Sequence, residues 1–271
     1  MPDWTPHDLT DLATAKRLLE NPGLAARLTG LLGTPLERGF HLLPANWNAR
    51  IQSATRRALE KALTVALGTM ADPPTPATAP TTAPRSPGNR LHKGLVAATG
   101  AGGGAFGLAA LAVELPISTT IMLRSIADVA RSQGEDLASI PGRLACLEVF
   151  ALGGRSPGDD ASESGYFLVR AALAKAIGEA TEHIAARGAA RESAPALVRL
   201  ISVIAARFGV VVSEKAAAVA VPVLGAAGGA AINVLFLDHF QRMAQGHFTV
   251  RRLERTYGGE AVRAAYLRLP G

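Results

Sequence analysis

The chain has 271 residues, of which 48% are hydrophobic, 18% are charged and 5% are aromatic. This composition excludes an intrinsically disordered protein, which combines low hydrophobicity with high net charge. The single cysteine, Cys146, excludes an internal disulfide framework and a zinc site built from several cysteines.

The formal net charge is +6, and much of the excess lies in residues 241–271, which contain six arginines and two glutamates. Such a segment is predicted either to be the solvated basic face of a terminal helix or to meet an acidic partner or an anionic lipid. Nucleic acid is not expected as a partner, because few aromatic residues interleave with the arginines and no zinc-finger or RNP-like motif accompanies them.

The first residues, MPDWTPHDLTDL, are acidic and lack a basic region followed by an apolar stretch, so no secretory signal peptide is expected. The predicted location is cytoplasmic, with association with the inner face of the cytoplasmic membrane as a further hypothesis.

Turn residues divide the first 70 residues into short helices. Thr5 and Pro6 resemble a helix cap followed by a first-turn proline, Gly33 ends a helix, and Thr34–Glu37 matches a capping box. The helices predicted here run from about Pro6 to Leu19, from Leu24 to Leu32 and from Trp47 to Met70.

Residues 71–90 contain six prolines together with threonine and alanine, a composition that cannot fill a helix interior or a packed core. A flexible Pro/Thr-rich loop is therefore predicted, interrupting a single domain that spans residues 1–271. Two separate domains joined by this segment are the alternative.

Two segments, Gly94–Val113 and Ala216–Leu237, carry no charged residue and are rich in glycine and alanine. Each is long enough to cross a bilayer core of about 30 Å, but glycine and alanine contribute little to insertion. The pairs Gly100/Gly104 and Gly225/Gly229 have the one-turn spacing that lets helix backbones approach closely. Buried helices of a soluble protein and membrane-inserted hairpins both remain open at this point.

Further helices are predicted over the rest of the chain, at Ser118–Gln133, Pro141–Leu152 and Glu163–Arg187, with another opening at Ser193–Pro195. Val210–Val212 is the one strand-like run. The predicted fold is all-α, a compact multi-helix bundle with Gly/Ala-rich, closely packed central helices.

Common catalytic and cofactor motifs find little support. Gly102–Gly107 satisfies the pattern G-x-G-x-x-G, but no strand precedes it and no βαβ repeat surrounds it. Glu179, Glu182 and His183 lie within one helical turn, where charge pairing with Lys175 is favoured over a metal site. No cofactor and no metal are expected, and Cys146 is predicted to be a buried, inert thiol.

Charged and polar residues that interrupt apolar runs are more informative, because burial of an unpaired charge costs several kcal/mol. Arg124 is predicted to be buried against Glu114 or Glu148. Six such residues form a candidate cluster: Glu114, Arg124, Glu148, Lys215, Asp238 and His239. The cluster is predicted to be either a set of structural ion pairs or a functional polar pocket.

The same stretches resemble the EcsC protein family. The resemblance rests on AFGLAALAVELPISTTIMLRSIADVARSQGEDL, RLACLEVFALGG, SGYFLVRAALAKA and VPVLGAAGGAAINVLFLDHFQRMAQGHFTVRRLERTYG, including a turn at Glu114–Pro116. It implies a bacterial, mainly helical protein whose namesake is encoded beside an ABC transporter, and it implies no reaction. Family-pattern positions, which carry no assigned roles, are Glu114, Arg124, Glu148, Pro222, Asn233 and His239.

Three hypotheses of function follow. The leading one is a non-enzymatic, membrane-proximal accessory module that binds a lipid, a small apolar ligand or a membrane-protein partner. The second is an enzyme whose pocket is built from the interrupting charges, and the third is a plain scaffold protein.

Overall fold

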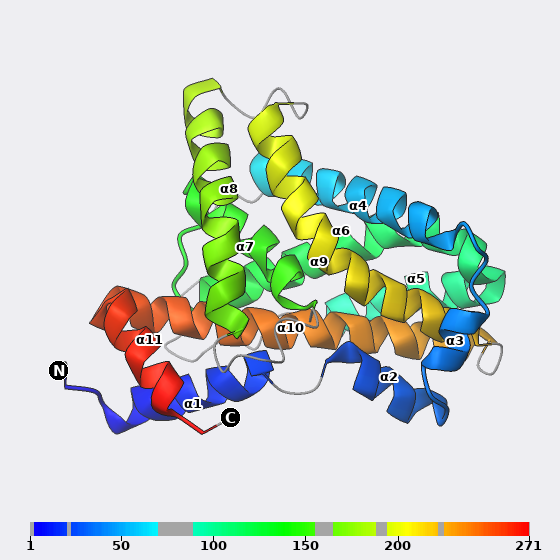
Figure 1. Ribbon diagram of the computed structural model, residues 1–271, viewed down its shortest axis with the longest axis horizontal. Coiled ribbons are helices and arrows are strands. Elements are labelled where there is room, and N and C mark those ends of the chain that lie inside the picture. Colours follow the sequence, from blue (N-terminus) through cyan, green and yellow to red (C-terminus); the bar gives the residue numbers. More distant parts are fainter. Residues whose placement is uncertain are drawn as a thin grey trace.

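A computed structural model describes residues 3–20, 23–69, 89–154, 165–187, 194–221 and 225–270. Within these ranges the chain forms helices and no strand, so the all-α prediction is confirmed (Figure 1). The helices are α1 (Pro6–Glu20), α2 (Leu24–Leu32), α3 (Glu37–His41), α4 (Trp47–Thr69), α5 (Asn89–Phe106), the 3-10 turn η1 (Gly107–Ala110), α6 (Leu111–Ser132), α7 (Ile140–Leu152), α8 (Gly165–Arg187), α9 (Pro195–Ala220), α10 (Gly225–Tyr257) and α11 (Gly259–Arg268).

Several helix ends follow the local chemistry of the sequence. The Thr5 hydroxyl accepts a hydrogen bond from the Asp8 amide at 3.1 Å and caps α1. α2 ends at Gly33, which adopts a left-handed backbone with φ of 63°. Ser139 caps α7 by accepting a hydrogen bond from the Gly142 amide.

Other local predictions are wrong. Leu36, rather than Thr34, precedes α3, and no side chain caps that helix. Glu114–Pro116 is no turn, because α6 continues through Pro116. Proline removes only one backbone donor, and tertiary contacts hold the rest of the helix.

The strand-like run Val210–Val212 lies within α9, where two of its valines enter the core, so packing overrides β propensity. Residues 70–88 of the predicted loop lie outside the described residues. Asn89 and Arg90, the last two residues of that predicted loop, begin α5 instead.

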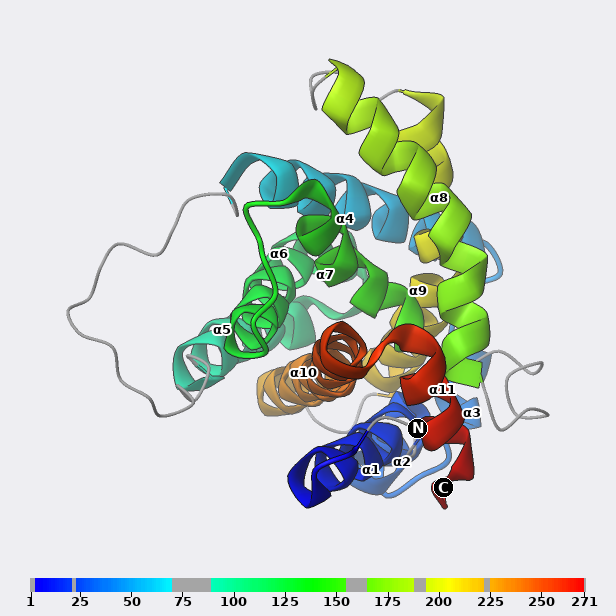
Figure 2. The ribbon, with the colours of Figure 1, turned by 90° about the vertical axis from the view of Figure 1, so that its left-hand side faces the viewer.

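α10 is the central helix of the structure and packs against α1, α2, α5, α6, α7, α9 and α11. It runs along the long axis of the molecule, and Figure 2, which looks nearly along it, shows α1 and α2 on one side and α5 and α6 on another. Phe150 of α7, Phe208 of α9 and Phe240 of α10 meet beside it, with ring centroids 5.0–5.5 Å apart. One core thus joins residues from both sides of segment 70–88.

α5 and α10 approach each other closely at Gly100. A β-carbon at this position would lie 2.4 Å from the Gly229 carbonyl oxygen and 2.7 Å from Asn233 Nδ2. The surroundings of Gly104 and Gly225 lie outside the described part of the chain. At Gly100, the absence of a side chain is what allows the two backbones to meet.

The two uncharged segments do not form single helices. Gly94–Val113 is divided among α5, η1 and α6, and Ala216–Leu237 begins in α9 and ends in α10. Among the described helices, α9 alone is long and apolar enough to cross a membrane. Its buried face includes Ile204 and Phe208, as expected also of a core helix, so length and composition do not distinguish the two cases.

The α5–α10 crossing predicts opposite effects of one substitution at two glycines of α5. Gly100→Ala should lower the free energy of unfolding by about 1–3 kcal/mol, because the new methyl group overlaps the Gly229 carbonyl oxygen and the Asn233 side chain. Gly94→Ala should be neutral or stabilising by up to about 1 kcal/mol, because a β-carbon there meets no atom within 4 Å. Urea unfolding of both variants measures the difference, and equal stabilities would contradict the close crossing.

Candidate functional site: a basic pocket between α1, α2 and α10

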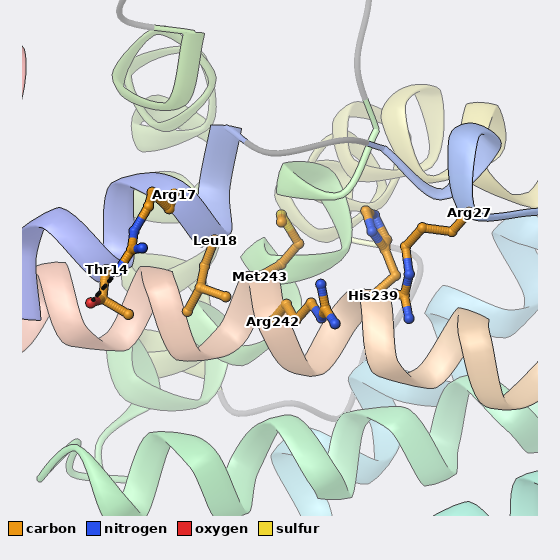
Figure 3. Close-up of a pocket in the computed structure, with 7 residues that line it drawn as sticks. All are labelled: Thr14, Arg17, Leu18, Arg27, His239, Arg242 and Met243. Atoms are coloured by element: carbon orange, nitrogen blue, oxygen red, sulfur yellow. Dashed lines mark hydrogen bonds between the residues drawn. The ribbon is translucent and has the colours of Figure 1, made fainter. Parts of the chain in front are cut away.

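A pocket of about 470 Å³ opens where α1 and α2 lie against α10 (Figure 3). It is lined by Thr14, Arg17 and Leu18 of α1, by Arg27 of α2, and by His239, Arg242 and Met243 of α10. Both three-residue sets follow i, i+3, i+4 spacing, which places them on one face of each helix. Three arginines therefore line the same pocket.

The close seating of α1 on α10 forms one wall of the pocket. A β-carbon at Gly246 would lie 2.7 Å from Leu19 and 3.0 Å from the Ala15 carbonyl oxygen. A larger residue at 246 would therefore push α1 outward. Glycine at this position sets the distance between the Arg17 side and the Arg242 side of the pocket.

Arg27 and Arg242 give the pocket a strongly cationic end. Their side chains extend toward each other along α10 (Figure 3). Burial, together with the nearby positive charge of Arg242, lowers the pKa of Arg27. Its Nη1 atom is buried and has no hydrogen-bond partner among the described residues.

One carboxylate, Asp238, faces this positive charge, and it is shared. Asp238 Oδ1 lies 2.9 Å from Lys93 Nζ, whereas Asp238 Oδ2 lies 3.8 Å from Arg27 Nη2. The closer partner is the lysine, so the two arginines are incompletely neutralised. The arrangement favours the arrival of an anion.

The remaining lining residues shape the pocket. Buried His239 donates a hydrogen bond from Nε2 to the Gly153 carbonyl oxygen at 2.9 Å, which fixes its ring. Leu18 and Met243 supply an apolar middle section. Beyond them, Arg17 donates a hydrogen bond to the Thr14 hydroxyl at 3.2 Å. The pocket therefore combines a cationic end, an apolar wall and a second polar end.

The six predicted cluster residues do not share one site. Glu114 and Lys215 form a buried ion pair, with Oε2 and Nζ 2.7 Å apart, and Asn233 Nδ2 donates to Glu114 Oε1 at 2.8 Å. Burial raises the pKa of Glu114, but the Lys215 ammonium and the hydrogen bonds outweigh it, so the net pKa is lowered. Lys215 also lies over the Phe236 ring, 4.7 Å from its centroid.

The prediction for Arg124 is wrong. Its side chain is exposed, and the carboxylates expected to pair with it have other partners. At 100° per residue, Arg124 falls on the same outward face of α6 as the exposed Val113 and Ile117. Arg124 follows apolar residues in the sequence but shares no face with those that are buried.

Glu148 belongs to a second buried network, between α7, α8 and α10. Glu148 Oε2 lies 3.7 Å from His247 Nε2, and Glu148 Oε1 lies 4.0 Å from Arg170 Nε. The Tyr166 hydroxyl and His247 Nδ1 are 3.0 Å apart, and Arg170 binds Glu254 through two hydrogen bonds of 2.7 and 3.0 Å. Burial raises the pKa of Glu148 to about 7.

His247 in the same network is held neutral. Burial, reinforced by the positive charges of Arg170 and Arg251, lowers the pKa of His247 well below its ordinary value. The motif search missed Tyr166, Arg170 and His247, because they come from α8 and α10 and meet only through tertiary packing.

The last two predicted residues, Asp238 and His239, border the basic pocket, and His239 lines it. Arg17, Arg27 and Arg242 were not among the predicted site residues. The helical spacing of 14, 17 and 18 and of 239, 242 and 243 was the available signal, but it becomes informative only once α1 and α2 are placed on α10.

Three of the six arginines of residues 241–271 pair with acidic side chains within the protein. Arg251 and Arg255 bind Glu135, and Arg252 lies 3.2 Å from Asp8 and also pairs with Asp11. The prediction of a solvated basic face is wrong for Arg251 and Arg252, which are only partly exposed because acidic residues distant in sequence pack against them, whereas Arg255 remains exposed.

Cys146 is buried, and burial raises the pKa of its thiol, as expected of an inert core cysteine. Glu179 lies 3.9 Å from Lys175, the predicted charge pair. Among the described residues, no group of three or more histidine, cysteine, aspartate or glutamate side chains is placed to hold a metal ion.

Residues 7–253 match the model of the EcsC protein family. No curated protein and no solved structure matches the chain.

The buried ion pair leads to a stability prediction. Lys215→Met should lower the free energy of unfolding by about 3–5 kcal/mol, because it leaves the buried Glu114 carboxylate without its charged partner. Adding Glu114→Gln should recover much of this loss. Arg124→Met, at an exposed position, should stay within about 0.5 kcal/mol of the parent. Chemical denaturation tests all three variants, and a Lys215→Met protein as stable as the parent would contradict the pairing.

The second network leads to a pH prediction. Glu148 keeps its proton up to a pKa of about 7 when folded but loses it near 4.5 when unfolded, so its favourable contribution is lost as the pH rises between these values. Relative to the parent, Glu148→Gln should therefore gain up to about 3 kcal/mol of stability between pH 4.5 and 7. Comparing the two proteins at each pH removes contributions common to both, and a difference that does not change with pH would refute the prediction.

Proposed function

We propose that this protein, which belongs to the EcsC protein family, is a non-enzymatic, membrane-proximal accessory module that binds an anionic, phosphate-bearing ligand in the basic pocket. The observation that carries the proposal is the convergence of Arg27 and Arg242 at one end of the pocket, where the one carboxylate paired with Arg27 among the described residues, Asp238, is shared with Lys93.

A phosphate group suits this end of the pocket. Guanidinium groups bind phosphate through paired, charge-assisted hydrogen bonds, and the buried Arg27 Nη1 atom would gain an acceptor that it lacks among the described residues. The anion would also relieve the repulsion between Arg27 and Arg242. Both the new hydrogen bonds and the neutralisation of the two arginines would therefore favour binding of the phosphate group.

The apolar section favours an amphiphilic ligand. Leu18 and the buried Met243 line the pocket next to the cationic end, so a ligand with a phosphate and an adjoining acyl chain would match both parts. A lipid headgroup and a free phosphate share the same anionic chemistry, and the apolar wall distinguishes them.

Binding is favoured over catalysis by the position of the acid–base candidates. Glu114 and Glu148 do not line this pocket but lie in separate buried networks. The charged residues that do line it are arginines, which orient and neutralise anions rather than exchange protons at neutral pH. The ring of His239 is held by the Gly153 carbonyl.

Titration calorimetry with short-chain soluble lipids tests the proposal. Dihexanoyl phosphatidic acid should bind more tightly than inorganic phosphate, and dihexanoyl phosphatidylcholine should bind weakly or not at all. Arg27→Gln and Arg242→Gln should each weaken binding of phosphatidic acid about tenfold or more, since a hydrogen bond to a charged group contributes about 1.5–3 kcal/mol.

Arg199→Gln removes the same charge from an exposed position on α9 and serves as the control. Arg27→Gln should melt no lower than the parent, because it removes one of two repelling charges. Equal affinity of all variants, or a tight complex with phosphatidylcholine alone, would overturn the proposal.

A further inference from the structure

One end of the molecule, distant from both termini, presents large apolar side chains to solvent. Phe40 and Leu42 are 44% and 54% exposed, and Val113 and Ile117 are 70% and 48% exposed. The first two belong to α3 and the residue after it, and the others to the first two turns of α6. Figure 1 shows α3 and the start of α6 at the same end.

A groove lies between the beginning of α4 and the junction of η1 with α6. It has a volume of about 380 Å³ and is lined by the beginning of α4, including Asn46, Trp47 and Arg50, and by Leu108, Leu111 and Ala112 of η1 and α6. The beginning of α4, which follows Leu42 closely in sequence, therefore faces the first turn of α6, which carries Val113. We call this surface, formed by Phe40, Leu42, Val113, Ile117 and the groove, the α3–α6 end.

The α3–α6 end is basic as well as apolar. Residues 34–57, which form its α3–α4 side, contain four arginines and one glutamate, Glu37, and one of these arginines, Arg56, pairs with Glu60. Arg38 and Arg50 are exposed, and Arg50 and Arg57 line the groove. The one acidic residue among the first turns of α6, Glu114, is buried against Lys215 and does not offset this charge.

We propose that the α3–α6 end docks onto an anionic phospholipid membrane, with Phe40, Leu42, Val113 and Ile117 entering the headgroup region. Arginines beside these side chains meet lipid phosphates while the apolar groups leave water, the combination found at membrane-surface segments. The inference extends the membrane-proximal part of the proposed function and does not depend on the basic pocket.

Charge favours a membrane over a second copy of the chain. In a two-fold symmetric dimer through this surface, the arginines of one copy would oppose those of the other, and like charges at an interface are unfavourable. An anionic bilayer supplies the opposite charge over the whole surface and adapts to separated apolar side chains.

The test is co-sedimentation of the full chain with vesicles of phosphatidylcholine alone or mixed with phosphatidylglycerol. The parent should bind the mixed vesicles, with binding that weakens at high salt, and should bind phosphatidylcholine poorly. The double variants Phe40→Ser/Leu42→Ser and Val113→Ser/Ile117→Ser should each lose about tenfold or more in affinity, because less apolar surface leaves water.

Leu168→Ser changes an equally exposed leucine on α8 and should bind as the parent does. All variants alter exposed side chains, and unchanged melting temperatures will show that the fold is intact. Failure of the parent to bind mixed vesicles, or parent-like binding by both double variants, would overturn the inference. So would a dimer of the parent that the double variants dissociate.

Pocket variants separate this inference from the proposed function. The Arg27→Gln and Arg242→Gln variants should still sediment with mixed vesicles, but their affinity for soluble phosphatidic acid should be reduced. If only the pocket variants fail to sediment with mixed vesicles, the pocket is the membrane-binding site, and docking by the α3–α6 end is overturned.

Discussion

Glu114, Lys215 and Asn233 hold four helices in one arrangement. The carboxylate comes from α6, the ammonium from α9 and the amide from α10, and Asn233 Nδ2 also lies 3.1 Å from the Val96 carbonyl oxygen of α5. A buried charge that lacks its partner is costly, so any displacement of one of these helices separates groups that must stay together. Apolar packing alone would tolerate small rotations of a helix; this network does not.

The network depends on backbone proximity as much as on charge. Gly100 brings α5 against Gly229 and Asn233 of α10, which places the Asn233 amide within reach of the α5 carbonyl. Small residues and the polar network therefore act together: the glycines allow the approach and the hydrogen bonds fix its register. α10, once positioned, carries His239, Arg242 and Met243 to the opposite side, where α1 and α2 complete the basic pocket.

Local features of the sequence predicted several helices and some of their ends, but not the partners of those helices. Thr5, Gly33 and Ser139 mark helix ends through bonds within a few residues, which a linear pattern contains. Glu114 and Lys215 are separated by 101 residues, and only the fold determines that they meet. Interruption of an apolar run identified both as candidates, yet the same rule failed for Arg124, which lies on the exposed face of α6.

The pocket shows the same limit. His239 was a candidate because it follows an apolar run, whereas Arg17 and Arg27 lie in ordinary amphipathic helices and carry no motif. Their common position arises from the seating of α1 and α2 on α10, and no periodicity within a single helix reveals it. Tyr166 and His247 were not predicted for the same reason. In the sequence each resembles an ordinary core residue, and only the fold brings the two side chains together.

The partly buried Arg27 near Arg242 ties the fold to its chemical surroundings. Packing holds two like charges close together in the corner where α1 and α2 meet α10, and a bound anion, as proposed, would replace their repulsion with attraction. Because a ligand that binds the folded chain raises its stability in proportion to the logarithm of its concentration, the corner would act as a thermodynamic reporter of anion supply. The stability of α1 and α2 would then be a property of protein and solution together, not of the chain alone.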